Sequence, residues 1–539
     1  MASLAAAFGS GAMTNSIEEL ENTEVIFVIG SNTTQQHPLV AMRIIDAVKK
    51  NGAKLIVADP RKIPLAENAA IYAPLAPGTN LAFINGLLNV IVNENLVNSD
   101  FVENNTEGFE EFKNSIQKYT PKLVSTITGV PENTIKEIAR LYSKAKTASI
   151  IYAMGITQHI SGTKNVAALA NLALITGQIG RESTGVNPLR GQNNVQGACD
   201  MGALPGVLPG YQSLKDENIS KKFANVWGKD YASGNGMTLG EMMDGSANGS
   251  VKSLFIMAEN PMLSDPNLTH VKEALENLEL LVVQDIFMTE TAKLAHVILP
   301  GASFIEKDGT FTNTERRVQR VRKAIEPVGS SKSDWQILCG LIKCLGGFAD
   351  YSSPSDIMEE IRTLVPSYRG ITYERLNDGG LQWPCTDINH SGTKFLHRGK
   401  FTRGLGKFSV NEYTESTELA TNEYPFILTT GRMNHHYHTG TMTRRSWALD
   451  REYPHGFMEI NPQDAEKLGL KERSKVKVTS KIGEVITEAH ITDKISVGVV
   501  FMTFHFGEQS VNKLIGKNSD PIVQIPEFKV CAVKIEGVK

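Results

Sequence analysis

A single arginine stands at the head of a run of amides and glycines between residues 187 and 202. The planar guanidinium of Arg190 can hold a small carboxylate through two parallel hydrogen bonds. The side-chain amides near it supply neutral donors and acceptors, and the glycines allow the main chain to approach a bulky ligand. We therefore predict an active-site segment with Arg190 as its catalytic residue, rather than a glycine-rich surface loop with an incidental arginine. Cys199 lies in the same segment, where a small buried thiol is the better interpretation than a catalytic group.

Two stretches of the chain share one plan of strands and helices that would position such a segment. Residues 25–30 and 54–59 predict buried strands, and residues 38–51 between them predict a helix with Pro38 in its first turn. Residues 254–258 and 280–285 repeat the two strands around a helix near 267–278. Further apolar stretches follow at 69–74 and 294–300, each ending in a proline at the same distance beyond an aspartate. Because each unit is a parallel βαβ crossover, the sequence predicts an α/β fold with two related Rossmann-like nucleotide-binding halves.

The polar residues that end these strands are the candidate ligand contacts. Ligands of such folds lie at the carboxyl ends of the strands. Asp59 and Asp285 end the second strand of each half, and Asn32 and Asn260 follow the first, so the aspartates are placed to bind ribose hydroxyls or a guanine edge. Two halves predict two nucleotide-like ligands, or one cofactor with two nucleotide arms. Coincidence is the alternative, but the matched spacing favours duplication.

A nicotinamide site is not expected, because neither half carries the GxGxxG fingerprint. The net charge of −3 indicates no nucleic-acid partner, and no apolar run reaches the ~20 residues that a membrane span needs. The five cysteines are scattered without a CxxC pair, which indicates reduced thiols in a cytoplasmic protein and no iron–sulfur ligand set within this sequence.

From about residue 400 the pattern changes to short strands. We predict strands at 425–430, 474–479, 484–491, 498–506 and 530–535, with a short helix at 462–467. This pattern favours a separate C-terminal β-barrel and a division into domains 1–190, 191–399 and 400–539. Before it, Ser333 caps a predicted helix that continues through 337–345, whose apolar periodicity places it in the core.

The segment 187–202 closely resembles the active-site stretch of molybdenum- or tungsten-dependent formate dehydrogenases, in the molybdopterin oxidoreductase family. The resemblance covers nearly the whole chain and implies two molybdopterin guanine dinucleotides around one metal, with the β-barrel as a cap. Arg190 matches the arginine that holds formate beside the metal. The positions that match the family's cofactor-contacting motifs are Gly30, Asn32, Asp59, Arg61, Gly78, Thr79, Asn80, Gly155, Thr157, Gln158, Gln192, Asn260, Gln284, Asp285, Arg432, His436, His438, Asn512, Phe528 and Lys529.

Three histidines, His435, His436 and His438, stand within four residues and invite a zinc interpretation. On a strand they would alternate between faces, and no fourth ligand lies nearby. The resemblance instead implies that His436 and His438 contact pterin or phosphate, so we predict no metal ligand in this sequence.

Complete members of the family begin with a cysteine-rich segment that binds a [4Fe-4S] cluster. A cysteine or selenocysteine that ligates the metal and a histidine that handles the proton follow it. This sequence begins with Met1 a few residues after the position of that pair. We expect it to be the part downstream of an in-frame UGA codon for selenocysteine, with a true truncation or a split gene as the alternatives. The activity of the chain on its own is left open.

The activity that the resemblance implies is the oxidation of formate to carbon dioxide. Electrons would leave through the pterin and the cluster to iron–sulfur or flavin subunits that reduce NAD or serve a hydrogenase. Another family member, such as a nitrate reductase, would share the cofactor scaffold, although the Arg190 segment favours formate. A non-catalytic paralogue with a scaffold role is the alternative of a different class.

Overall fold

The computed structural model describes residues 1–228 and 234–538. They form two compact units, the first made of Met1–Gly191, Ser264–Asn267 and Phe395–Lys539 and the second of Gln192–Leu263 and Leu268–Lys394. The first unit is thus built from both ends of the chain and combines residues of the first and third predicted domains. The predicted boundaries at 190 and 399 stay a prediction.

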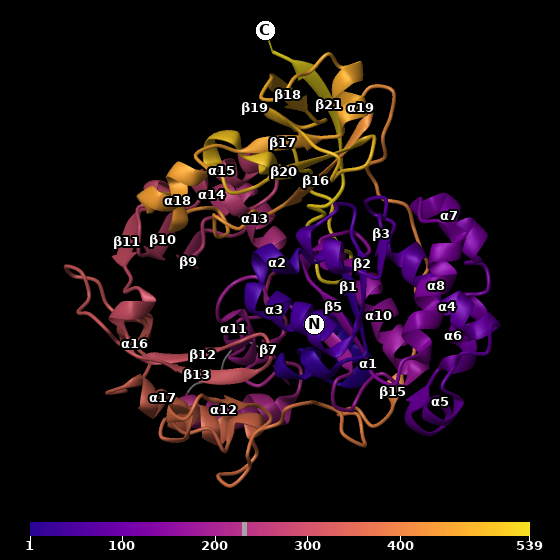
Figure 1. Cartoon of the computed structure of the whole chain (residues 1–539). Helices are drawn as coiled ribbons and strands as arrows, with labels where there is room; N and C mark the ends of the chain where they lie inside the picture. Colours follow the sequence, from indigo (N-terminus) through magenta and orange to yellow (C-terminus); the bar gives the residue numbers. More distant parts are fainter. Residues whose placement is uncertain (229–233, 539) are drawn as a thin grey trace. The chain divides into compact units, whose positions relative to one another are not determined.

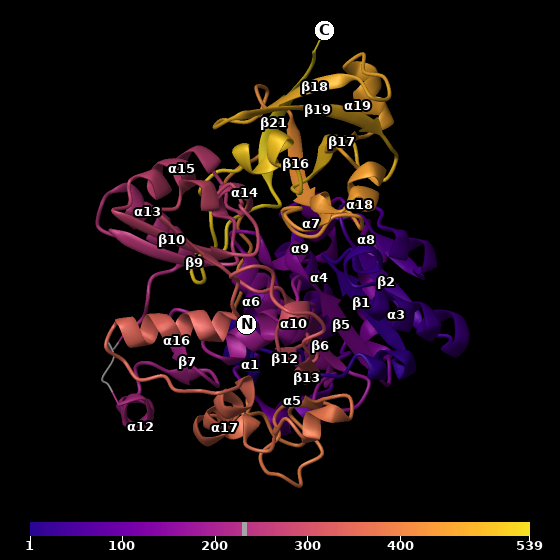
Figure 2. The same ribbon diagram turned by 90° about the vertical axis from the view of Figure 1, so that its left-hand side faces the viewer.

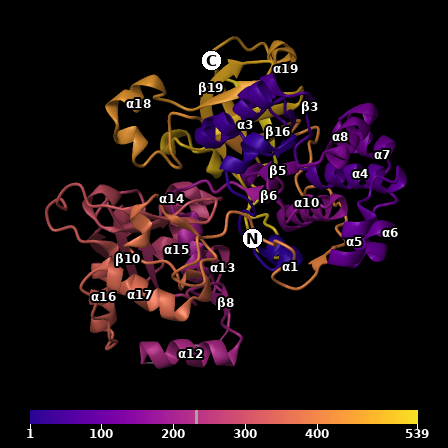
Figure 3. The same ribbon diagram turned by 60° about the horizontal axis from the view of Figure 1, so that its bottom comes forward.

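The centre of the first unit is a parallel sheet of five strands in the order β3-β2-β1-β5-β6. β1 and β5 are buried along their whole length, as parallel strands with helices on both faces must be. Figures 1 and 3 show α3 on one side of these strands and α4 and α8 on the other. The strands are β1 (Val25–Ile29), β2 (Lys54–Ala58), β3 (Ile71–Ala73), β5 (Ala148–Tyr152) and β6 (Gly185–Pro188).

Alternate side chains of β1 divide between two apolar clusters on opposite faces of this sheet. Ile26 and Val28 pack in the cluster that contains α3, whereas Phe27 and Ile29 pack in the larger cluster that contains α4, α8 and α10. The helices of the first unit are α1 (Ala2–Phe8), α2 (Thr33–Gln36), α3 (Pro38–Asn51), α4 (Asn80–Asn93), α5 (Ser99–Asn105), α6 (Phe109–Ser115), α7 (Pro121–Thr128), α8 (Glu132–Lys144), α9 (Met154–Thr157) and α10 (Gly162–Thr176), beside a small pair of strands, β4 (Thr106–Glu107) and β15 (Gly406–Lys407).

The C-terminal part of the first unit is a closed barrel of six strands, ordered β16-β20-β17-β19-β18-β21, which confirms the predicted β-barrel. Its interior is filled by aliphatic side chains such as Leu428, Val478 and Met502. The sequence pattern missed strand β17 and helix α18. The barrel elements are β16 (Phe426–Gly431), α18 (Trp447–Glu452), β17 (Phe457–Ile460), α19 (Pro462–Lys467), β18 (Lys475–Thr479), β19 (Glu484–Ile491), β20 (Val499–Thr503) and β21 (Cys531–Gly537).

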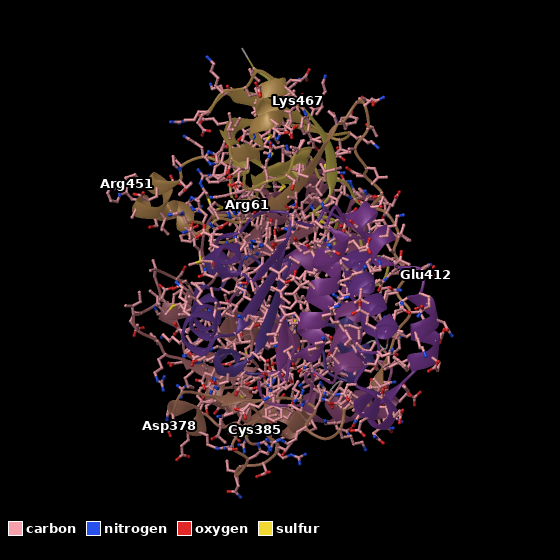
Figure 4. All side chains as sticks on the ribbon, turned by 45° about the vertical axis from the view of Figure 1, so that its right-hand side comes forward. Arg61, Asp378, Cys385, Glu412, Arg451 and Lys467 are labelled. Atoms are coloured by element: carbon pink, nitrogen blue, oxygen red, sulfur yellow. The ribbon has the colours of Figure 1, made fainter. Side chains whose placement is uncertain are left out.

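Several polar contacts join the barrel part to the α/β part within this unit, among them those made by the buried carboxylates of Glu459 and Asp520. Arg61, just beyond β2, donates from Nε and Nη2 to the two carboxylate oxygens of Glu459 in β17, and its guanidinium lies 4.4 Å from the ring centroid of Phe501. Asp520 accepts hydrogen bonds from the main chain and the hydroxyl of Thr163 in the first turn of α10, at 2.8 and 2.7 Å. Figure 4 labels Arg61 between the indigo strands and the barrel.

The second unit contains a parallel sheet of three strands in the order β11-β10-β9. This order and direction are those of β3-β2-β1, so the two halves share one topology, as the sequence repeat predicts. Figure 2 shows α13 and α15 along these strands, and they share an apolar cluster with Leu281 and Val283. The remaining elements are α11 (Val195–Asp200), β7 (Val207–Leu208), β8 (Gln212–Ser213), α12 (Glu217–Trp227), α13 (Leu239–Ala247), β9 (Ser253–Met257), α14 (Pro261–Ser264), α15 (Leu268–Glu276), β10 (Leu280–Asp285), β11 (Val297–Pro300), β12 (Gly309–Thr312), β13 (Arg317–Val321), α16 (Asp334–Cys344), α17 (Pro354–Leu364) and β14 (Leu381–Gln382).

One expectation about this unit is wrong. Helix α16 starts at the predicted Ser333 cap with a full capping box, but none of its residues is buried. Leu338 and Ile342 are 36% and 41% exposed, so the helix is not part of the core. Apolar periodicity identifies the face that a helix would bury, but it does not supply the element that covers that face.

None of the helices in the described part of the chain combines the length and the apolar character that crossing a membrane requires.

Candidate active site

A cavity opens in the first unit at the carboxyl ends of β1, β2 and β5 and beside the end of β16. This is the edge of a parallel sheet where ligands bind. Ten of the residues predicted to contact a cofactor line it: Gly30, Asn32, Asp59, Arg61, Gly78, Asn80, Gly155, Gln158, Arg432 and Lys529.

Two glycines bring main chain to the wall of this cavity. The Gly155 N–H donates to the Gly30 carbonyl at 3.1 Å, which joins the turns after β5 and β1. A Cβ atom on Gly155 would lie 2.6 Å from the carbonyl oxygen of Gly30, and Gly30 itself has a φ of +58°. Only glycine fits both positions without displacing the main chain.

The cavity concentrates positive charge that water does not solvate well. Desolvation lowers the pKa of Lys529 to about 8, with a further decrease from the neighbouring Arg432, while Asp59 opposes the shift. Desolvation also lowers the pKa of Arg432. Burial raises the pKa of Asp59 to about 6, against the effects of Arg61 and Lys529. An anionic group in the cavity would compensate the charges of Lys529 and Arg432. A diphosphate has the charge to do this.

Several neutral polar atoms of the wall are also unsatisfied. Asn32 Oδ1, Gln36 Nε2, His37 Nδ1 and His159 Nδ1 are buried and have no hydrogen-bond partner among the described residues. Buried donors and acceptors are normally paired, so a polar ligand is expected to pair them. Together, the poorly solvated cations and the unpaired neutral atoms fit a molecule that carries phosphates and a polar heterocycle, such as a pterin dinucleotide.

Arg61 lines the cavity, but most of its charge is already compensated. Its guanidinium makes the two-bond contact with Glu459 described above, and its main-chain N–H donates to Asp59 Oδ1 at 3.0 Å. Arg61 therefore shapes the wall and fixes Asp59, while Arg432 and Lys529 are the cations that remain for an anionic ligand.

Arg190 follows β6 and borders the cavity through its neighbours. Leu189 and Gly191 both line the cavity, and a Cβ on Gly191 would approach Arg432 Nη1 to 3.2 Å. The half-buried Arg190 side chain lies 3.5 Å from the Gly11 carbonyl through Nη2, and its own carbonyl lies 2.8 Å from His37 Nε2. The geometry thus brings the predicted catalytic residue to the edge of the predicted cofactor site.

Six predicted contacts of this unit are not part of the cavity wall. Thr79 precedes the first residue of α4 and Thr157 ends α9, each next to wall residues. The Phe528 carbonyl accepts a hydrogen bond from the Thr430 hydroxyl at 2.7 Å. The ring of His436 contacts the Tyr453 carbonyl and Thr443 Oγ1, and the Asn512 amide donates to Ser264 at 3.0 Å. Desolvation and Arg432 lower the pKa of His438 to about 4, so its ring is neutral at physiological pH.

Four predicted contacts lie in the second unit, three of them at the carboxyl ends of β9 and β10. Asn260 Oδ1 accepts the main-chain N–H and the hydroxyl of Thr291, at 3.2 and 2.7 Å. Asp285 Oδ1 accepts the N–H groups of Ile286 and Phe287. Gln284 Nε2 donates to Asp334, while its buried Oε1 has no partner among the described residues. The fourth residue, Gln192, begins this unit ahead of α11.

The sequence interpretation missed two histidines of the cavity wall, His37 and His159. Desolvation lowers the pKa of His159 to about 4, and its Nε2 lies 2.8 Å from the Gly155 carbonyl and 3.1 Å from Asn80 Nδ2. Both histidines directly follow turns that were predicted to bind ligand, and this position is the only sequence signal that could have indicated them.

Comparison with known proteins shows which family the chain is similar to. Residues 1–344 match the family model described as "Molybdopterin oxidoreductase", and residues 426–532 match the one described as "Molydopterin dinucleotide binding domain". The chain is 54% identical over 540 residues to the F420-dependent formate dehydrogenase subunit alpha of Methanocaldococcus jannaschii, which spans 99% of this chain and 80% of that protein. It is 42% identical over 546 residues to formate dehydrogenase H of Escherichia coli. That alignment covers 100% of this chain and 76% of the relative.

A solved structure is similar across the same length. Acetylene hydratase from Pelobacter acetylenicus superposes with a TM-score of 0.79 at 21% identity, over 99% of this chain and 80% of that one, which shows a shared fold. Taken with the two family matches and the whole-chain relatives, this means that the chain belongs to the molybdopterin oxidoreductase family and is an oxidoreductase of that family.

Proposed function

We propose that this chain is the catalytic subunit of a formate dehydrogenase, which oxidises formate to carbon dioxide. The observation that carries the proposal is the sequence identity of 54% and 42% that the whole chain shares with a formate dehydrogenase subunit alpha and with formate dehydrogenase H. The position of Arg190 at the edge of the cationic cavity supports it, because a guanidinium there can bind a one-carbon carboxylate next to a bound cofactor.

The cofactor is proposed to be two molybdopterin guanine dinucleotides that share one molybdenum or tungsten ion. When bound, this group supplies a redox-active metal that accepts the two electrons of the formate C–H bond. Lys529 and Arg432 would hold phosphates of one dinucleotide, and Asn32 would contact its polar heterocycle. Asn260, Gln284 and Asp285, which end the equivalent strands of the second unit, would hold the other.

Arg190 would bind formate through two parallel hydrogen bonds and so fix the direction of its C–H bond. The same guanidinium offsets the charge of the formate carboxylate, while Lys529 and Arg432 are taken up by the phosphates. Electrons would pass to an iron–sulfur or flavin subunit in the cytoplasm. The name of the Methanocaldococcus jannaschii relative favours an F420-reducing partner over one that reduces NAD.

The proposal can be tested on protein purified from cells that make molybdopterin dinucleotides. Metal analysis should give one molybdenum or tungsten per chain, and acid hydrolysis should release two equivalents of GMP. Formate should reduce a viologen dye, whereas nitrate should not oxidise the reduced dye. Nitrate turnover without formate turnover would identify another activity of the family, and protein with neither metal nor GMP would indicate a non-catalytic scaffold.

A further inference from the structure

His37 links the cavity to Arg190, and its main chain is held on both sides. It lies between α2 and α3, where its N–H donates to the Thr33 carbonyl at 2.8 Å and its carbonyl accepts from Ala41 at 3.0 Å. The main-chain position of His37 is therefore fixed by the end of α2 and the start of α3. Its imidazole ring lines the cavity.

The contact with Arg190 defines which ring nitrogen carries the proton. Nε2 lies 2.8 Å from the Arg190 carbonyl oxygen, which can only accept a hydrogen bond, so Nε2 is the donor. Burial lowers the pKa of His37, and the nearby Arg432 lowers it further, although the bond to Arg190 opposes the shift. In the neutral ring, Nδ1 is therefore a lone-pair acceptor.

This acceptor is buried and has no partner among the described residues. On the same turn, Asn32 Oδ1 is a second unpaired acceptor and Gln36 Nε2 an unpaired donor, and all three side chains line the cavity. Two acceptors beside one donor would repel a phosphate but match the edge of a neutral heterocycle that carries N–H groups. Phosphate is better placed at Arg432 and Lys529.

We propose that His37 is a positioning residue that couples the bound cofactor to Arg190. Its Nε2–H holds the Arg190 main chain, and its Nδ1 accepts a hydrogen bond from an N–H group of the cofactor's heterocycle. The bound heterocycle fixes the ring, the ring fixes the Arg190 carbonyl, and the guanidinium is thereby held for formate. This inference rests on the proposed function for the identity of the ligand and the substrate.

Two substitutions and one control separate this role from packing. His37→Phe keeps a planar ring of similar size but removes both the donor and the acceptor. His37→Gln restores an N–H donor and an oxygen acceptor on a side chain of comparable reach. His490→Gln is the control, because His490 lies on β19 of the barrel and pairs with Glu472 at 2.8 Å, away from the cavity wall.

Three measurements on the cofactor-loaded protein test the coupling. Hydrogen exchange in a peptide that covers residues 185–192 reports whether Arg190 is held, and the loss of GMP during dialysis reports cofactor retention. The Michaelis constant for formate reports how well the Arg190 guanidinium binds the substrate. In His37→Phe we expect exchange, GMP loss and the formate KM each to rise about tenfold, with kcat changed less than about threefold. His37→Gln should return all three to within about threefold of the unmodified protein.

The proposal is overturned if folded His37→Phe protein shows unchanged exchange at 185–192 or unchanged GMP retention. It is also overturned if folded His37→Gln protein behaves like His37→Phe, because packing alone would then explain the change. The exchange and GMP measurements need no formate. If the unmodified protein does not oxidise formate, the proposed function fails, and the role of His37 is still decided by those two measurements.

Discussion

At the level of single residues, the proposed function assigns formate binding to Arg190. Replacement by Lys keeps the charge but removes the planar pair of donors. Loss of one charge-assisted hydrogen bond is worth about 1.5–3 kcal/mol, so kcat/KM for formate should fall about 10- to 150-fold. Steady-state kinetics would measure this. The control is Arg181→Lys, which changes an exposed arginine before β6. Unchanged formate turnover in Arg190→Lys would refute the role proposed for Arg190.

Asp59 gives the cofactor-free protein a pH dependence with a defined sign. Its pKa is about 6 in the folded chain and 3.8 in the unfolded reference, so the folded state binds the proton more tightly. The contribution of Asp59 to stability is therefore present below pH 4 and is lost as the pH rises to about 6.

The Asp59→Asn variant should not show this loss. Relative to the unmodified protein, it should gain about 2 kcal/mol in the free energy of unfolding between pH 4 and pH 6.5. Denaturant titrations of both proteins at each pH would measure the difference, in which the effects of His159 and other buried groups cancel. If the free energy of unfolding varied with pH in the same way in both proteins, Asp59 would be solvated in the folded state.

The candidate contacts at strand ends could be predicted from sequence because an apolar strand followed by Asn or Asp is a local pattern. The role of His37 could not. It depends on a cavity to which Arg432 contributes from far along the chain, and on a hydrogen bond to the carbonyl of Arg190, which any residue type would present.

At the level of elements, the close approach of the turns after β1 and β5 predicts that Gly155 is irreplaceable. Gly155→Ala would press a methyl group against the Gly30 carbonyl, and one of the two turns would have to move. We expect a loss of about 1–3 kcal/mol in stability, together with weaker GMP retention.

A helical glycine provides the matched control. In Gly340→Ala, the new Cβ on α16 would meet nothing within 4 Å, so stability should rise by about 0.5–1 kcal/mol. Melting temperatures of the two variants would therefore move in opposite directions. A shift of the same sign in both would contradict the close approach.

Local signals account for the elements that sequence predicted well. Helix α3 keeps its predicted bounds because Pro38 starts it and Gly52, with a φ of +73°, ends it. Strand β17 was missed because it has only four residues and includes Glu459, whose charge is compensated by Arg61, 398 positions away. Helix α16 was wrongly placed in the core because periodicity is local and burial is not.

At the level of the whole molecule, the two compact units predict two transitions in calorimetry. Asp520→Ala should lower only the transition of the first unit, because Asp520 caps α10 and also accepts from Ile522 and Val523. Loss of a buried acceptor with several donors should cost about 2–4 kcal/mol. Hydrogen exchange would assign the transitions to the two units.

The control is Asp46→Ala, which breaks an exposed ion pair with Lys50 and should move neither transition measurably. A shift of both transitions by Asp520→Ala would show that the units unfold together.

The discontinuous make-up of the first unit also sets an order of events during synthesis. The cavity wall draws Gly30 from the beginning of the chain and Lys529 from near its end, and the last strand, β21, lies between β16 and β18 to close the barrel. While residues 192–394 are being translated, all five strands of the early sheet have been synthesised, but the wall residues from 429 to 529 have not. The complete cavity wall therefore exists only after Lys529 has been translated, and we expect the cofactor to enter after that point.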